Sequence, residues 1–347
     1  MGRGRAGAVV AAAAVVGSLG IGTQATAETS AAPDCPETGV VTIEAVVDGL
    51  DALDCDLAGT RLDAGGFGVP VPEAGETVTV SLLTDDGTSP SLELSVADDG
   101  LVTAVLETTG TTPLGRTVER LQAGAAPDRV EVVDLSADAS AHADDVSAQA
   151  VGRCRLTDNN RLSYRWTTPA TWRLNVERVP NGVTRTQWTS ATRNAVTTIE
   201  NARNNCGMSV NPTLDLRMPG TTAVDADIDG ASNACTARDG RSVIDGGHLT
   251  GSVLGLTCAW SSSGRVIEAD VRIDRSERRW VTSVSGCRGS RFHVGSTLAH
   301  ELGHAVGLGH VTERGGSDLT MSPSMPPCNA SSASLGRGDV LGLRSHY

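Results

Sequence analysis

The first part of the chain has a strand-like pattern of apolar and polar residues. Short runs such as VTIEAVV, TVTVSLL, LELSV, LVTAVLE and VEVVDL alternate with a period of about two and are separated by Gly, Asp and Pro. Alternation of that period turns one face of an extended strand toward a core, and Gly and Pro mark the turns between strands. We therefore predict a small β-rich domain over residues 28–135, a sandwich or a barrel.

The second part of the chain mixes strand and helix patterns. Residues 186–203 have the length and apolar spacing of a helix, and further helices are expected from about Val294 and over the C-terminal LGRGDVLGLRSHY. RLSYRW, TWRLNVER, PTLDLRM, GSVLGLTCAW and RVIEADVRID indicate strands, and the alternation in RVIEADVRID is typical of a half-buried edge strand. The order of elements predicts an α+β domain over residues 151–347.

Residues 136–150, SADASAHADDVSAQA, show neither pattern and indicate an exposed linker. Charge changes at the same place. Residues 28–150 contain 24 acidic and 4 basic residues, whereas residues 151–347 contain 17 acidic and 22 basic residues. We expect the acidic and the more basic region to attract each other.

The N-terminus has the pattern of a secretory signal peptide. Two arginines precede the apolar run AGAVVAAAAVVGSLGIG, and Ala25 and Ala27 fit the small-residue rule for cleavage, so residues 1–27 are predicted to be removed. The alternative is a transmembrane anchor, but the run is short and rich in Ala and Gly. We expect a secreted, extracellular and monomeric protein with no membrane or nucleic-acid partner.

The number of cysteines agrees with export. An even number of eight, without a C-x-x-C pair, favours disulfide bonds over a cysteine-ligated metal. The first region holds only Cys35 and Cys55, which we expect to pair. Six cysteines in the second region allow fifteen connectivities. One hypothesis among them is pairing in sequence order: Cys154–Cys206, Cys235–Cys258 and Cys287–Cys328.

The candidate chemistry lies in the segment HELGHAVGLGH. On a helix His300 and His304 share one face, and Glu301 lies near enough to contact a water on a metal held there. Gly307 can take the positive φ that ends the helix and returns His310 as a third ligand. Three imidazoles leave one position of a tetrahedral zinc open, as catalytic sites require, and Glu301 would act as general base.

The full pattern H-E-x-x-H-x-x-G-x-x-H resembles the metzincin zinc endopeptidases, and Met321-Ser322-Pro323 is similar to the matrixin branch. The resemblance covers about residues 154–347. It implies a mixed twisted sheet, a long helix, a zinc-binding helix, a Met-turn at Met321 and a C-terminal helix, with Met325 as a weaker candidate for the turn. It also implies that RVIEADVRID borders the cleft and binds extended substrate by strand addition.

Two features near this resemblance remain open. Arg153, Cys154 and Asp158 partly match the cysteine switch of matrixins, but a disulfide is the alternative role of Cys154. The position of residues 28–135 ahead of the catalytic region suggests an inhibitory or folding-assisting pro-segment, which would make the chain a zymogen.

A weaker motif is the run of Asp225, Asp227 and Asp229 followed by Gly230, which has the D-x-D-x-D-G opening of a calcium loop. Thr236 stands at the twelfth position, where that loop has glutamate. The motif therefore has two interpretations, a Ca²⁺ site or a solvated acidic loop.

Together these patterns predict a secreted zinc-dependent endopeptidase that hydrolyses peptide bonds with a zinc-bound water and Glu301. Its partners would be protein or peptide substrates. One alternative is an extracellular binding protein built on a catalytically silent zinc fold, although the intact Glu301 argues against it. The other alternative is a zinc amidase acting on cell-wall amides.

Overall fold

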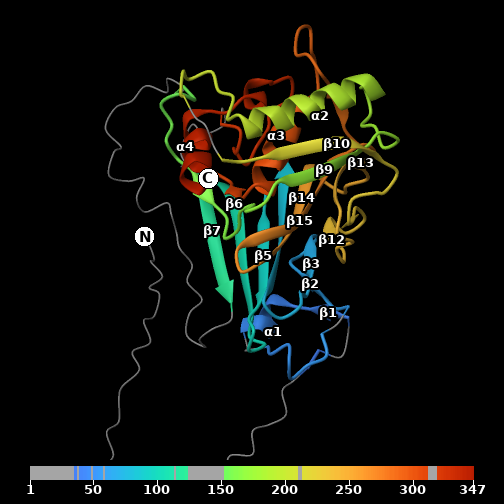
Figure 1. Ribbon diagram of the computed structural model, residues 1–347, viewed down its shortest axis with the longest axis vertical. Helices are drawn as coiled ribbons and strands as arrows, with labels where there is room; N and C mark the ends of the chain where they lie inside the picture. Colours follow the sequence, from blue (N-terminus) through green and yellow to red (C-terminus); the bar gives the residue numbers. More distant parts are fainter. Residues whose placement is uncertain are drawn as a thin grey trace, which may run out of the picture. The chain divides into compact units, whose positions relative to one another are not determined.

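The computed structural model describes residues 35–36, 39–47, 50–57, 59–112, 115–123, 152–209, 213–311 and 319–347. The predicted signal peptide, the predicted linker and the run VEVVDL lie outside these residues. Within the described residues the chain folds as a mixed α+β structure with much more sheet than helix (Figure 1), which confirms the predicted fold class.

Both parts of the chain contribute to one nine-stranded sheet of order β10-β9-β13-β15-β14-β4-β5-β6-β7. The C-terminal part supplies β9 (Ala170–Asn175), β10 (Leu216–Thr222), β13 (Ser242–Gly247), β14 (Val253–Ser262) and β15 (Arg265–Asp274). The N-terminal part supplies β4 (Glu76–Thr84), β5 (Ser91–Val96), β6 (Val102–Thr112) and β7 (Gly115–Ala123). The prediction of β-strands is confirmed here, but β4–β7 extend this sheet and do not form a sandwich or barrel of their own.

A second sheet of order β1-β2-β3-β12-β11 also combines the two parts. Its strands are β1 (Val40–Val41), β2 (Arg61–Asp63), β3 (Gly68–Pro70), β11 (Ile228–Asp229) and β12 (Ala234–Cys235). The run VTIEAVV was expected to be a strand, yet after β1 it forms the short helix α1 (Ile43–Val47). A run of seven residues is too short for its apolar period to separate strand from helix.

Two short strand pairs complete the sheet structure that is described. They are β16 (Arg279–Val281) with β17 (Arg291–His293), and β18 (Leu308–Gly309) with β8 (Asn160–Arg161). The predicted strand RLSYRW is therefore strand only at its first residue.

The three predicted helices are present. They are α2 (Arg185–Glu200), α3 (Val294–Ala305) and α4 (Arg337–His346), and a short 3₁₀ turn η3 (Ser331–Ala333) lies before α4. Thr184 and Gln187 form a capping box that fixes the start of α2. Helices α2 and α3 pack against each other beside the main sheet, as Figure 1 shows. No helix among the described residues is long and apolar enough to cross a membrane.

Apolar side chains gather in two clusters. One contains Trp172, Leu298 and Leu83, and the other contains Val80 and Trp260. Because successive side chains of a strand point to opposite faces, β4 takes part in both clusters, with Leu83 in the first and Val80 in the second. The core of the C-terminal part is therefore continuous with residues of the N-terminal part.

The position of RVIEADVRID differs from the prediction. This segment is β15, which lies between β13 and β14 and is not an edge strand. Its alternating polar side chains Glu268, Asp270, Arg272 and Asp274 are all buried. Arg272, for example, pairs with Asp245 at 2.6 Å. The polar residues that suggested a solvated face therefore form internal ion pairs and hydrogen bonds.

The four disulfide bonds follow sequence order, which confirms the hypothesis for the second region and the pair in the first. They are Cys35–Cys55, Cys154–Cys206, Cys235–Cys258 and Cys287–Cys328. Since Cys154 is bonded to Cys206, the cysteine-switch interpretation of this segment is wrong.

Candidate metal centre

The three histidines of HELGHAVGLGH converge on one point. The Nε2 atoms of His300 and His304 are 2.9 Å apart, and that of His310 is 3.2 Å from the first and 3.1 Å from the second. His300 and His304 lie one turn apart on α3. His310 returns because Gly307 ends the helix with φ +90°, at a position where a Cβ would collide with the carbonyl oxygen of Tyr164. We call these three residues the histidine cluster.

The outer nitrogens of the histidine cluster determine what its inner nitrogens can do. His300 Nδ1 donates to the carbonyl oxygen of Thr320 at 2.7 Å, and His304 Nδ1 donates to that of Leu308 at 2.8 Å. Burial lowers the pKa of His300 to about 4, against the effect of the Thr320 carbonyl, so the ring is neutral. A neutral ring with its proton on Nδ1 has a lone pair on Nε2. Lone pairs that face each other repel, and a shared cation removes the repulsion.

The spacing of these nitrogens fits zinc. Zn–N bonds of about 2.0–2.1 Å in a tetrahedron place the nitrogens about 3.3 Å apart, close to the separations found here. Imidazole is a ligand that zinc prefers, and a backbone carbonyl on the opposite nitrogen is the usual support of such a ligand. His300, His304 and His310 therefore have the chemistry and the spacing to hold one zinc ion.

Glu301 lies beside the histidine cluster and is completely buried. The hydroxyl of Thr257 on β14 donates to its Oε2 at 2.7 Å, and its Oε1 has no hydrogen-bond partner among the described residues. Gly255 leaves room for the carboxyl group, because a Cβ there would lie 2.5 Å from Oε1. Burial raises the pKa of Glu301 to about 8, against the lowering by Thr257. A cation held nearby would instead favour the carboxylate.

Met321 packs against α3 at Gly303, where a Cβ would overlap its sulfur. Asp339 of α4 holds this segment, since its carboxyl accepts from the backbone N–H of Thr320 at 2.8 Å and of Met321 at 3.1 Å. Met325 lies farther along and accepts a hydrogen bond from Thr297.

Three residues near the centre were not found from the sequence. Thr257 and Asp339 carry no motif, because they reach the site only through the packing of β14 and α4. For Gly255 the sequence contained a weak indication, because a glycine within a strand often marks a place where other atoms approach the backbone closely.

The aspartates of the predicted calcium loop do not come together. Asp225 pairs with Arg178 at 2.5 Å, and Asp229 accepts from Ser232 at 2.5 Å. Only Asp227 joins a group of candidate ligands, and its neighbours there come from elsewhere in the chain. The structure therefore does not support a calcium site made of Asp225, Asp227 and Asp229, because ion pairs and turns use two of the three carboxylates.

Asp227, Asp239 and Glu268 form what we call the acidic cluster. Glu268 accepts from the backbone N–H of Gly240 at 2.5 Å and of Asp239 at 3.3 Å. Burial, together with the hydrogen bond and charge of Asp227, raises the pKa of Glu268 to about 7. Protonation and backbone donors thus satisfy Glu268, whereas Oδ2 of Asp227 is buried without a hydrogen-bond partner among the described residues.

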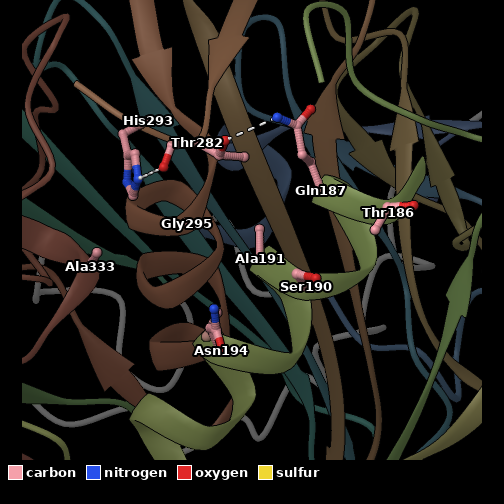
Figure 2. A pocket seen from close by; sticks show the side chains of 10 residues that line it. Thr186, Gln187, Ser190, Ala191, Asn194, Thr282, His293, Gly295 and Ala333 are labelled. Carbon is pink, nitrogen blue, oxygen red and sulfur yellow. Dashed lines mark hydrogen bonds between the residues drawn. The ribbon is translucent and has the colours of Figure 1, made fainter. Parts of the chain in front are cut away.

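An open pocket of about 410 Å³ lies apart from the histidine cluster. Figure 2 shows its lining between α2 and the start of α3, with His293 and Gln187 directed toward Thr282. Gln187 donates to the Thr282 hydroxyl at 3.4 Å, and His293 contacts the Thr282 carbonyl oxygen at 3.3 Å. His293 is the N-cap of α3, so it has a structural role. Neither Glu301 nor any member of the histidine cluster lines this pocket.

A mixed sheet, a helix with two histidines one turn apart, a third histidine after a glycine turn and a neighbouring glutamate together define the class of zinc-dependent hydrolases. The sequence profile of the matrixin family matches residues 165–347, which is more than half of the chain. The chain belongs to the matrixin family. Membership implies a zinc metalloendopeptidase that acts on peptide substrates. A search of curated proteins finds no match to the chain.

Proposed function

We propose that this chain is a secreted zinc-dependent endopeptidase in which His300, His304 and His310 bind the metal and Glu301 is the general base. The observation that carries the proposal is the convergence of three Nε2 atoms within 3.2 Å of one another beside a buried carboxyl group with an unpartnered oxygen. A structural core has no need of such an arrangement, because buried polar atoms are normally paired.

Zinc held by these residues would supply a water molecule with its pKa lowered to about 7 and would polarise the carbonyl group to be attacked. The chain's own residues supply the rest. Thr257 holds Oε2 of Glu301, which leaves Oε1 as the atom that accepts the proton of the attacking water and returns it to the leaving amine. The carbonyls of Thr320 and Leu308 keep two imidazoles oriented and basic at Nε2. Met321, under the helix, would be the residue of the Met-turn.

Export and latency belong to the same proposal. Four disulfide bonds favour an oxidising compartment. The acidic region would be the pro-segment of a zymogen. Among the described residues, ion pairs such as Glu76 with Arg238 at 2.8 Å and Asp85 with Arg278 at 3.1 Å join it to the more basic region. Each pair is at least partly solvated, so charge complementarity orients the regions more than it stabilises them.

The first experiment compares secreted wild type with secreted Glu301→Ala by intact mass and by digestion of an unfolded protein. Wild type should be trimmed of its acidic region and then cleave the protein, and the variant should retain zinc, stay full length and cleave nothing. Equal digestion by both proteins would refute the role of Glu301. A parallel digest of muropeptides tests the amidase alternative. Zinc binding without hydrolysis of either substrate would favour the binding protein.

A further inference from the structure

The edge of β14 next to the candidate centre is occupied by another part of the same chain. One edge of β14 pairs with β15, and the other edge pairs antiparallel with β4 of the acidic region. The pairing continues along the strand, with Leu256 opposite Leu82 and Thr257 opposite Ser81. An extended peptide that binds to a sheet makes the same main-chain hydrogen bonds to a free edge.

One face of β4 is turned toward the catalytic residues. Directly opposed residues of an antiparallel pair point to the same side of the sheet. Ser81 therefore lies on the side of Thr257, whose hydroxyl binds Glu301, and Leu83 lies on the side of Gly255, which makes room for Glu301. In agreement, Leu83 belongs to the same apolar cluster as Leu298 and Leu302 of α3, and α3 contacts β4.

The end of β4 is held between two walls. On one side the backbone N–H of Asp85 donates to the carbonyl oxygen of Ser252 at 3.0 Å. On the other side Thr84 forms a parallel bridge with Ser324, and the Ser89 hydroxyl donates to the carbonyl oxygen of Pro323. The end of β4 thus lies between β14 and the segment that follows Met321, whereas Thr77–Ser81 of β4 pair with β5 on the edge opposite β14.

The covered surface differs from an ordinary core. Glu301, which contacts this face of β14, has 0% exposure. Thr79 Oγ1, Ser81 Oγ and Glu301 Oε1 are buried there without a hydrogen-bond partner among the described residues. Because buried polar atoms are rarely left unpaired, these three distinguish the contact from an ordinary core: two belong to β4 and one to the surface that β4 covers.

We propose that β4 occupies the position of a peptide substrate, so that the full-length chain is latent until β4 leaves the edge of β14. This inference rests on the proposed function. An occupant tethered in the same chain competes at an effective concentration of about millimolar, which an ordinary substrate does not match. Cleavage within residues 124–150 leaves every one of these contacts intact. Activation therefore requires that β4 be displaced or digested, in addition to any cut in that segment.

The test measures peptide binding in a chain that cannot cleave. The probe is a fluorescein-labelled peptide with the sequence of residues 76–86, ETVTVSLLTDD. Full-length Glu301→Ala should bind it weakly, because its own β4 occupies the edge of β14. Adding Leu83→Asp places a carboxylate against the catalytic face and should tighten binding of the probe at least about tenfold. A probe with the same Leu-to-Asp change is the control and should not bind. Equal affinity of both proteins for the probe would overturn the proposal.

A second variant holds β4 in place, whereas Leu83→Asp displaces it. Unfolding of the protein could not produce the results expected for both variants. Thr79 and Ala259 are directly paired, and Thr79→Cys with Ala259→Cys would lock β4 onto β14 by a disulfide. With Glu301 intact, Leu83→Asp should hydrolyse a short peptide, whereas the locked chain should stay inactive even when the Leu83→Asp change is added to it. A locked chain as active as Leu83→Asp alone also overturns the proposal. If Leu83→Asp increases probe binding but none of the variants hydrolyses the peptide, then the proposed protease function is refuted, whereas the proposal that β4 occupies the substrate position is supported.

Discussion

The histidine cluster and the acidic cluster each bring three metal-binding side chains together, yet their surroundings differ. In the histidine cluster backbone carbonyls bind the outer nitrogens of two rings, and the inner lone pairs face one another. In the acidic cluster backbone N–H groups point at the carboxyl oxygens, and the pKa of Glu268 is raised to about 7, so a proton relieves the repulsion of like charges.

This difference shows that proximity of ligands alone does not identify a metal centre. The informative feature is whether a lone pair or a proton meets the neighbouring ligands. In the acidic cluster backbone N–H groups bind Glu268, and burial raises the pKa of both Glu268 and Asp227, so protons compete with a metal there even though Oδ2 of Asp227 has no hydrogen-bond partner among the described residues. The histidine cluster keeps its lone pairs, together with Oε1 of Glu301.

The largest expected effect is the loss of a ligand. His304→Ala should abolish zinc binding and lower kcat/KM on an unfolded protein by about 10³-fold or more, because metal catalysis supplies several kcal/mol and each 1.36 kcal/mol is tenfold. Zinc content by atomic emission and initial rates check it. Asp239→Asn in the acidic cluster is the matched control, and it should change neither quantity. A large loss of zinc in this control would erase the contrast between the clusters.

The next largest effect distinguishes the role of Glu301 as general base from the role of the histidines as metal ligands. Glu301→Gln should keep zinc at one equivalent and lower kcat by about 10²–10⁴-fold, since a neutral amide cannot accept the proton. Metal analysis and rates on the same sample make the measurement. A variant that loses zinc along with activity would show that Glu301 supports the ligands and is not simply the base.

A smaller effect is expected at the residue that positions Glu301. Thr257→Val removes the only side-chain donor to its carboxyl that the structure describes, at a distance of 2.7 Å, and should lower kcat about tenfold with little change in KM. Thr257→Ser retains the hydroxyl and should recover most of the rate. If serine and valine behave alike, the hydroxyl does not position the base.

The smallest effect concerns the acidic cluster and appears as stability. The pKa of Glu268 is about 7 in the folded protein and about 4.5 for an unperturbed glutamate, so the folded state binds its proton more tightly. Stability from this group is full below pH 4.5 and is lost as pH rises through 7.

Glu268→Gln does not titrate, so its stability relative to wild type should increase between pH 5 and pH 8. The expected gain is about 1 kcal/mol, or about 2–4 °C in Tm, because the exposed Asp239 lets solvent screen the charge. Thermal melts of both proteins across this range test it. A difference that does not vary with pH would mean that Glu268 is ionised throughout.

Much of the site could be predicted because its ligands lie close together in the chain. His300, His304 and His310 fall on one helix and one turn, so local geometry brings them together almost regardless of the rest. The acidic cluster was missed for the opposite reason. Its members come from two loops and from β15, and Asp227 was instead assigned to a loop with Asp225 and Asp229, which have other partners.

The sequence alone determined the α+β class, the three long helices and the spacing of HELGHAVGLGH, because each depends on local periodicity or on short-range order. The disulfide pairs of the second region were one hypothesis among fifteen connectivities. Only the tertiary structure decided that β15 is internal, that Thr257 and Asp339 support the centre, and that β4 covers it. Long-range packing of whole faces determines which strands are neighbours. The sequence of a strand predicts that it is buried, but not which element covers it. The access of a substrate to Glu301 is therefore a property of the folded chain.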